Sequence, residues 1–434
     1  MRVLMFSWEY PPVVEGGLGR HVRGLAEQLV VQGVELHIVS RGPEAIQYEE
    51  RQGVIVHRIA QPPFPRDADA FLRWVADMNR EMSALADGLA TELEIDLVHS
   101  HDWLVSDAAR ACARDIERPW VVTVHATEHG RHQGWVNTHP QSAIHRAERA
   151  MARGADRIIT CSRYMRGHVA EVFGVPRRRI TALRNGIDPT AATPPVDVAR
   201  ARAGLAAPDE LLVLLVGRLV YEKGFHVALD ALAPLVHGSA PLVHGSAPLV
   251  DGSAPLVQAG APSAGTPPLS RARAAGARPR VRFAVVGTGT AEQELRLQAR
   301  RLGLERAGAF LGWVGDERLR ELYRAADVCV VPSLYEPFGI VALEAMAGGC
   351  PCVVADTGGL REIVPAGERV GVRVPPDDAG ALRDALSRLL GDTRLRARLA
   401  AEALEHVGTF DWPRVAEATR EVYARVCAQV PARA

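Results

Sequence analysis

The sequence alternates short apolar runs with longer stretches of helical periodicity, and this alternation constrains the fold more than any other feature. An apolar run at 2–7 is followed by a glycine turn at 16–19, a helix at 21–33 and an apolar run at 34–40. Because helices join parallel strands and cover their sheet, this order predicts a doubly wound α/β fold. Further strands are expected at 96–103, 120–126 and 157–162, and further helices near 104–114 and 141–153.

A second α/β series begins after the polar, proline-rich stretch 185–197, which we interpret as a linker. Its strands are expected at 210–218, 280–287, 307–314, 328–333 and 350–356. A last helix is expected at 410–430, with Pro413 near its first turn. Two doubly wound domains of comparable size therefore account for the 434 residues.

Four tandem heptads, APLVHGS, APLVHGS, APLVDGS and APLVQAG, interrupt the second series over 233–260. A period of seven is typical of coiled coils, but each unit contains a proline and a glycine, which break helices. We therefore expect a low-complexity surface insertion over about 233–279 that is disordered and dispensable.

The overall charge and the cysteines limit the class of protein. Lys+Arg and Asp+Glu both number 51, which argues against a generally basic, nucleic-acid-binding chain. No apolar run approaches the roughly 18 residues of a spanning helix, although peripheral contact with a membrane stays open. The 6 scattered cysteines lack metal-binding or redox spacing, which indicates reduced thiols in a cytoplasmic protein.

One lysine stands out against the composition, because 50 of the 51 basic residues are arginine and only Lys223 is lysine. Lys223 and Arg218 lie in GRLVYEKG, directly after an expected strand, where open α/β sheets bind their ligands. A forked charge beside a point charge suits a diphosphate. The alternative is a solvated charge pair.

Two carboxylates follow another expected strand, in EPFGIVALE. A retaining glycosidase needs two such groups about 5 Å apart, whereas eight residues of helix span about 12 Å. Pro337 and Gly339 place Glu336 on a loop and Glu344 inside a helix. The two acids are therefore expected to contact different parts of one elongated ligand, such as a sugar nucleotide, or else to serve as a helix cap and a surface ion pair.

A string of the zinc-peptidase type, His125-Ala-Thr-Glu128-His129, ends an expected strand rather than lying on one helix. We therefore predict no metal site and treat His125 alone as a candidate facing the cleft. The glycines at 16–19 form either a tight turn or a loop that admits an anion to a helix N-terminus. Trp103, His132 and Trp135 could stack on sugar rings or simply pack.

Taken together, the motifs resemble those of the family 4 glycosyltransferases of GT-B fold. The resemblance is carried by SWEYPPVVEGGLGRHV, DLVHSHDWL, HATEHGRHQGW, RNGID, VGRLVYEKG, YEPFGIVALEAMAGG and FDW. SWEYPP and HATEHGRHQGW are most similar to the glycogen synthase-like α-1,4-glucan glucosyltransferases of actinobacteria. The resemblance implies two Rossmann-like domains facing across a cleft. It places an acceptor-side domain at 1–192, a nucleotide-sugar-binding domain at 193–408 and a returning helix at 409–434.

The resemblance also implies roles for individual residues. The catalytic group would comprise Glu336, His125, Arg218 and Lys223. Arg218 and Lys223 would hold the leaving diphosphate, Glu336 the donor-sugar hydroxyls, and His125 the donor sugar near its anomeric carbon. The remaining donor-binding residues would be Gly17, Leu18, Asp102, Gly339, Ile340 and Glu344, and the acceptor would contact Trp135 and His132.

The reaction that the resemblance implies is the retaining transfer of a hexose, glucose, from UDP- or ADP-glucose to an α-glucan or oligosaccharide through an α-1,4 linkage, with no cofactor and no metal. One departure from glycogen synthases is the lack of a lysine near the glycine turn, where Glu15 stands instead and Arg20 is the candidate for the missing charge. The alternatives are a family 4 mannosyl- or hexosyltransferase acting on a lipid or small molecule, a sugar-nucleotide epimerase, and a non-catalytic sugar-binding protein.

Overall fold

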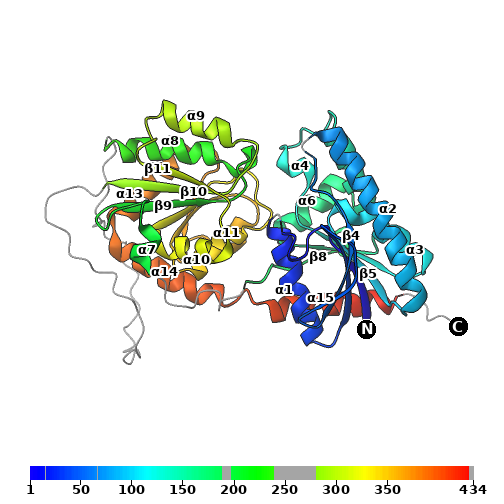
Figure 1. Ribbon diagram of the computed structural model, residues 1–434. Helices are drawn as coiled ribbons and strands as arrows, with labels where there is room; N and C mark the ends of the chain where they lie inside the picture. The colour runs from blue at the N-terminus through cyan, green and yellow to red at the C-terminus, as the bar shows by residue number, and fades with distance from the viewer. Residues whose placement is uncertain (15, 66, 188–196, 239–279, 430–434) are drawn as a thin grey trace, which may run out of the picture.

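The structure is a computed structural model that describes residues 1–14, 16–65, 67–187, 197–238 and 280–429. The chain forms two parallel-sheet halves that lie side by side (Figure 1). We call residues 1–187 the N half and residues 197–408 the C half. The predicted α/β class, with two Rossmann-like units, is confirmed.

The sheet of the N half has eight strands in the order β3-β4-β2-β1-β5-β6-β7-β8. These strands are β1 (Arg2–Phe6), β2 (Glu35–Gly42), β3 (Ile46–Arg51), β4 (Val54–Ala60), β5 (Leu97–His101), β6 (Trp120–Val124), β7 (Arg157–Thr160) and β8 (Ile180–Ala182). All pair in parallel except β3, which runs antiparallel to β4. The strand order reverses between β1 and β5, and ligands bind beyond the carboxyl ends of strands at such a point.

Helices cover both faces of this sheet. One face packs on α1 (Gly17–Val31) and α15 (Trp412–Cys427). The other face packs on α2 (Ala68–Glu92), α3 (Ser106–Asp115), α5 (Gln141–Gly154) and α6 (Arg163–Phe173). Apart from the exposed edge strand β3, the strands are buried on both faces, which explains why most of them are rich in apolar residues.

The C half repeats this plan with six parallel strands in the order β11-β10-β9-β12-β13-β14. The strands are β9 (Leu211–Val216), β10 (Val281–Val286), β11 (Gly308–Gly312), β12 (Val328–Val331), β13 (Cys352–Ala355) and β14 (Val372–Val374). Its helices are α7 (Val198–Arg202), α8 (Phe225–Val236), α9 (Glu292–Arg301), α10 (Asp316–Ala325), α11 (Ile340–Ala347), α12 (Leu360–Ile363), α13 (Ala379–Gly391) and α14 (Thr393–Val407). The order reverses between β9 and β12, so the loops after these two strands meet.

Two predictions of local structure are wrong. The helix expected at 21–33 begins earlier, at Gly17, so Gly17 and Gly19 lie in the first turn of α1, which is held by the Glu9 carboxylate. Oε2 of Glu9 accepts hydrogen bonds from the amides of Gly16 and Gly19 at 3.1 and 3.3 Å. The repeat insertion does not begin at 233, because residues 233–236 complete α8 and contribute buried side chains to the core. Residues 239–279 lie outside the described residues.

The chain crosses between the halves twice, and the two crossings touch. The Ile187 amide donates a hydrogen bond to the Phe410 carbonyl at 2.8 Å, and Ile187 forms a parallel bridge with Asp411. From there α15 runs back along α1 in the N half (Figure 1). Among the described helices, none combines the length and apolar composition needed to cross a bilayer.

Candidate active site

The N-terminal ends of two helices from different halves face one another. A Cβ placed on Gly17, the first residue of α1, would lie 3.7 Å from Cγ2 of Ile340, the first residue of α11. Gly339 precedes α11 with φ 107°, and a Cβ there would lie 2.5 Å from Leu360 Cδ2, so only glycine fits. Helix N-termini carry partial positive charge, so the gap between them favours an anion.

Lys223 and Glu336 form an ion pair at the switch point of the C half. Lys223 ends a short 3₁₀ turn after β9, and Glu336 lies in the loop after β12. Lys223 Nζ is 2.7 Å from Glu336 Oε2, which also accepts a 3.1 Å hydrogen bond from Ser333 Oγ. Glu336 is only 7% exposed. The sheet order therefore brings together two predicted site residues that are 113 positions apart.

Arg218 lies on the same loop but is held differently. It is half-exposed, and its Nη2 lies 3.6 Å from Glu222 Oε1. Partial burial in the cleft, and then the nearby charge of Arg131, lower the pKa of Arg218. Arg131 was not singled out in the sequence. It belongs to the N half and is the third cation of the site, beside Lys223 and Arg218 of the C half.

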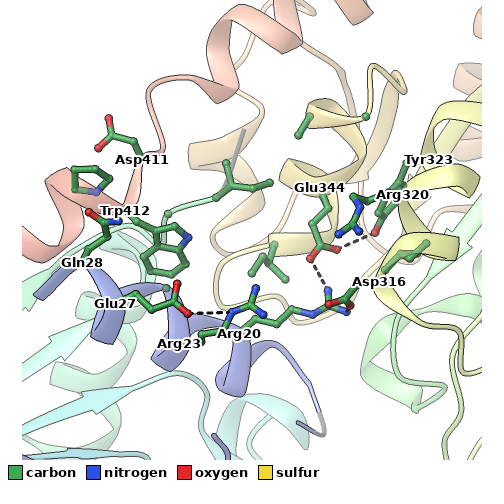
Figure 2. A pocket seen from close by; sticks show the side chains of 18 of the residues that line it. Arg20, Arg23, Glu27, Gln28, Asp316, Arg320, Tyr323, Glu344, Asp411 and Trp412 are labelled. Carbon is green, nitrogen blue, oxygen red and sulfur yellow. Dashed lines mark hydrogen bonds and ion pairs between the residues drawn. The ribbon is translucent and has the colours of Figure 1, made fainter. Parts of the chain in front are cut away.

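Glu344 is bound from both halves. Its Oε2 accepts a 3.0 Å hydrogen bond from the Tyr323 hydroxyl, and its Oε1 pairs with Arg20 Nη1 at 2.6 Å. Arg20 Nη2 also contacts Asp316 at 2.8 Å. Figure 2 shows these groups around a cavity of about 430 Å³ between α1, α10 and α11. Glu336 and Glu344 are placed as predicted, one on a loop and one within α11.

His125 follows β6 directly and is fixed by neighbours at the switch point of the N half. Its amide donates to Asp102 Oδ1 at 2.7 Å, and its Nε2 lies 3.0 Å from His101 Nδ1. Burial lowers the pKa of His125 to about 3 and raises that of Asp102 to about 6. The imidazole is therefore neutral at neutral pH. His129 lies instead on a short helix with His145 and His168 as ring neighbours, so the zinc-peptidase string does not form.

The three candidates for sugar stacking have different environments. Trp103 is buried in the apolar core, so the stacking role is wrong for it. His132 Nε2 lies 3.1 Å from Glu128 Oε1 with its side chain 42% exposed. Trp135 is 78% exposed, which leaves an aromatic face available to a ligand.

Sequence comparison places this geometry in a known family. The family described as Glycosyltransferase Family 4 matches residues 15–191, and the one described as Glycosyl transferases group 1 matches residues 269–406. A glycogen synthase from Mycobacterium tuberculosis is 38% identical, covering 98% of this chain and 94% of that relative. The chain belongs to the family 4 glycosyltransferases. It is a hexosyltransferase.

Other proteins similar to this family 4 glycosyltransferase have different names. A D-inositol 3-phosphate glycosyltransferase from Kineococcus radiotolerans is 29% identical, covering 98% of this chain and 95% of that relative. Sucrose-phosphate synthase from Thermosynechococcus elongatus has a TM-score of 0.75 at 24% identity, covering 98% and 99% of the two chains. The catalytic domain of starch synthase IV from Arabidopsis thaliana, bound to ADP and acarbose, has a TM-score of 0.71 at 17% identity with the same coverage. These structures establish the GT-B fold.

The family 4 glycosyltransferase also has buried carboxylates that the sequence did not reveal. Glu9 caps α1, as described above. Glu148 lies within α5, and both of its oxygens accept from the Glu128 amide at 2.8 and 3.0 Å. Burial raises the pKa of Glu148 to about 8. A glutamate inside an amphipathic helix carries no sequence signal of burial, whereas the position of Glu9 in the SWEYPP motif is a signal of a functional or structural role.

Proposed function

We propose that this glycosyltransferase elongates an α-1,4-glucan by single glucose units taken from UDP- or ADP-glucose, with retention at the anomeric carbon. The N half would bind the acceptor and the C half the nucleotide-sugar, in the cytoplasm. Support comes from the 38% identical glycogen synthase. The observation that carries the proposal is the approach of Gly17 to Ile340, which sets two positive helix ends around one gap.

In this proposal the leaving diphosphate lies in that gap. The N-termini of α1, through Gly17 and Leu18, and of α11 would donate amide hydrogen bonds to it. Lys223 and Arg218 would neutralise the charge that develops as the glycosidic bond breaks. Lys223 is preorganised for this role, since it is already held at 2.7 Å from Glu336. The transfer would need no metal, because cations of the chain supply the charge.

The donor sugar would lie between the two switch points. Glu336 and the backbone at Gly339 and Ile340 would bind its hydroxyls, and His125 would contact it near the anomeric carbon. Asp102 would line the same pocket and hold His125 through its amide, 2.7 Å away. The closed cleft would exclude water, which otherwise hydrolyses the donor.

The ribose would bind Glu344. Arg20 already pairs with that carboxylate at 2.6 Å, so ribose binding has to share or displace this contact. Arg20 therefore acts as an interdomain contact in this structure rather than as a free phosphate ligand. The acceptor glucan would contact Trp135, whose ring is exposed, with His132 beside it.

A donor and acceptor panel tests the proposal. The purified protein is incubated with UDP-glucose, ADP-glucose, GDP-mannose or UDP-N-acetylglucosamine, each with and without maltooligosaccharides. Nucleotide release and product mass are measured together. Nucleotide release from a glucose donor only when the glucan is present, with products growing by single hexoses, is expected.

The same panel addresses a second function. The D-inositol 3-phosphate glycosyltransferase among the relatives favours a small-molecule acceptor as the alternative. Turnover of GDP-mannose, or the absence of any glucan product, would support this alternative or a lipid acceptor. Release of free sugar without an acceptor would instead indicate an epimerase-like reaction.

A further inference from the structure

Three histidine side chains from three elements converge beside the cleft. His21 belongs to α1, His101 is the last residue of β5, and His125 is the first residue after β6. One ring nitrogen of each lies within 4.8 Å of those of the other two. The sheet reversal between β1 and β5 creates this meeting point, because α1 follows β1 directly.

Three ring nitrogens of this cluster make no hydrogen bond to any described residue. Both ring nitrogens of His21 and Nε2 of His101 are buried and lack a partner among the described residues. Asn185 is the polar side chain that interacts with His21, but its Oδ1 likewise has no partner with normal hydrogen-bond geometry among the described residues. His21 is 4% exposed and His101 is 0% exposed. Burying a polar group without a partner is energetically costly, and His21, with neither ring nitrogen partnered among the described residues, is the member of the cluster that lacks a ligand.

The donor set fits a transition metal. Imidazole nitrogens suit zinc, copper and nickel, whereas calcium and magnesium prefer oxygen. His101 Nδ1 and His125 Nε2 form a 3.0 Å hydrogen bond, and this spacing is close to the roughly 3.3 Å between two nitrogens on a tetrahedral zinc ion, so an ion could take the place of the shared proton. The ring of His21 is centred 4.6 Å from that of His125 and would complete the set by a small rotation.

The surroundings of the cluster also suit a cation. The buried Asp102 carboxylate accepts a hydrogen bond from the His125 amide and fixes the backbone at that member of the cluster. His125 is the one member of the trio that is partly exposed. Three protein ligands leave one position open on a tetrahedral ion. That position would therefore face the cleft.

We propose that His21, His101 and His125 bind one divalent transition-metal ion of the zinc class, and that the bound ion inhibits sugar transfer. The binding stands on the cluster alone. The inhibition rests on the proposed function, in which His125 contacts the donor sugar, because a metal-bound imidazole loses that contact. The ion takes no part in the transfer itself.

Binding is tested on the full chain after treatment with a chelator. Cobalt is followed by the visible absorption of its four-coordinate form, and zinc by calorimetry. One equivalent of each metal is expected, with affinity at least 100-fold weaker in His21→Asn and in His101→Asn. The control is His226→Asn, since His226 stacks on Tyr221 outside the cluster and its loss should change nothing.

Two results would overturn the binding claim: no uptake of either metal up to millimolar concentration, or equal affinity in wild type and His21→Asn. Thermal melting of each variant shows whether it is folded. If His21→Asn does not fold, the affinity of His101→Asn decides whether the cluster binds the metal. Inhibition is tested by adding zinc to the transfer assay and restoring the rate with chelator. Each rate is expressed relative to the metal-free rate of the same protein. On this scale, half-inhibition of His21→Asn should need at least tenfold more zinc than half-inhibition of wild type.

The outcomes separate the two proposals. Binding without inhibition would overturn the inhibitory part and leave the metal site. Lack of turnover with every donor would overturn the proposed function, while the cobalt and zinc titrations would still decide the site.

Discussion

Arg20 and Glu344 join the two halves of the molecule through a 2.6 Å ion pair between α1 and α11. Arg20 reaches Asp316 as well, so one guanidinium bridges two carboxylates of the C half (Figure 2). The side chains of Arg20 and Glu344 are 31% and 18% exposed. A pair so placed contributes to holding the cleft closed in the absence of ligand and is screened by salt.

We predict that Arg20→Ala opens the unliganded protein. An exposed ion pair contributes up to about 1 kcal/mol, a shift of roughly fivefold between closed and open populations. Small-angle scattering at low salt should therefore give a larger radius of gyration for the variant than for wild type. High salt should bring wild type toward the variant. Identical scattering at both salt concentrations would contradict an interdomain role for Arg20.

We predict that Lys223→Ala and Glu336→Ala each lower turnover by at least about 100-fold, because a well-placed charge contact is worth ~2.7–4 kcal/mol in the transition state. The double variant should be little slower than the worse single variant, since the two residues act as a unit. Steady-state rates with the preferred donor measure this. Arg394→Ala, an exposed position on α14, is the control. Near-normal rates in either single variant would remove that residue from the mechanism.

We predict that Gly24→Ala destabilises the protein while Gly88→Ala stabilises it. A Cβ on Gly24 would lie 2.3 Å from Trp412 Cε2, whereas a Cβ on Gly88 would have nothing within 4 Å. Overpacking costs roughly 1–3 kcal/mol, and relief of a helical glycine contributes about 1 kcal/mol. Thermal unfolding of the two variants should shift in opposite directions. Equal shifts would show that α15 is not packed tightly on α1.

We predict that Glu148 makes stability fall as pH rises from about 5 to about 8. Its pKa is raised from 4.5 to about 8, so in this range the folded protein holds a proton that the unfolded chain releases. The slope is up to about 1.4 kcal/mol per pH unit. Glu148→Gln should remove this contribution, as measured by urea unfolding at several pH values. The control Glu171→Gln lies on the exposed side of α6 and should leave the slope as in wild type.

We predict that replacing residues 239–279 by a short Gly-Ser linker leaves activity and melting temperature nearly unchanged. The cut follows Gly238 because α8 ends at Val236 and His237 Nε2 bonds to the Leu302 carbonyl at 2.8 Å. Extending the deletion to 233 should lower the melting temperature, because Ala233 and Leu235 are buried. Collapse of the shorter deletion would show that the heptads are structural.

Most strands were predictable from sequence because they are buried on both faces and read as apolar runs. The hairpin of β3 and β4 was missed, since β3 is a charged edge strand, IQYEER, without an apolar face. The glycine segment was misjudged because its helical start depends on the Glu9 side chain, which reaches Gly19 across 10 positions. Local patterns do not contain such contacts.

The candidate site was predictable in part. Lys223 and Glu336 each follow a strand, and the sheet order then makes them neighbours, so their meeting could be anticipated. The Arg20–Glu344 pair spans 324 positions and depends on how the halves pack, which no spacing encodes. Trp103 could stack on a sugar or pack, and it packs in the core; sequence could not decide this, because an indole in a ligand-binding motif and an indole in a core look alike.

The contact between Ile187 and Asp411 has a consequence for motion between the halves. Two connections that were far apart would lock the halves against one another, and a single connection would leave them free to turn in every direction. Two connections that meet at one bridge act as a pivot. Opening of the cleft is then a rotation about that point, and displacement grows with distance from it. Ile187 and Asp411 themselves barely move, while groups at the far rim of the cleft travel the longest path.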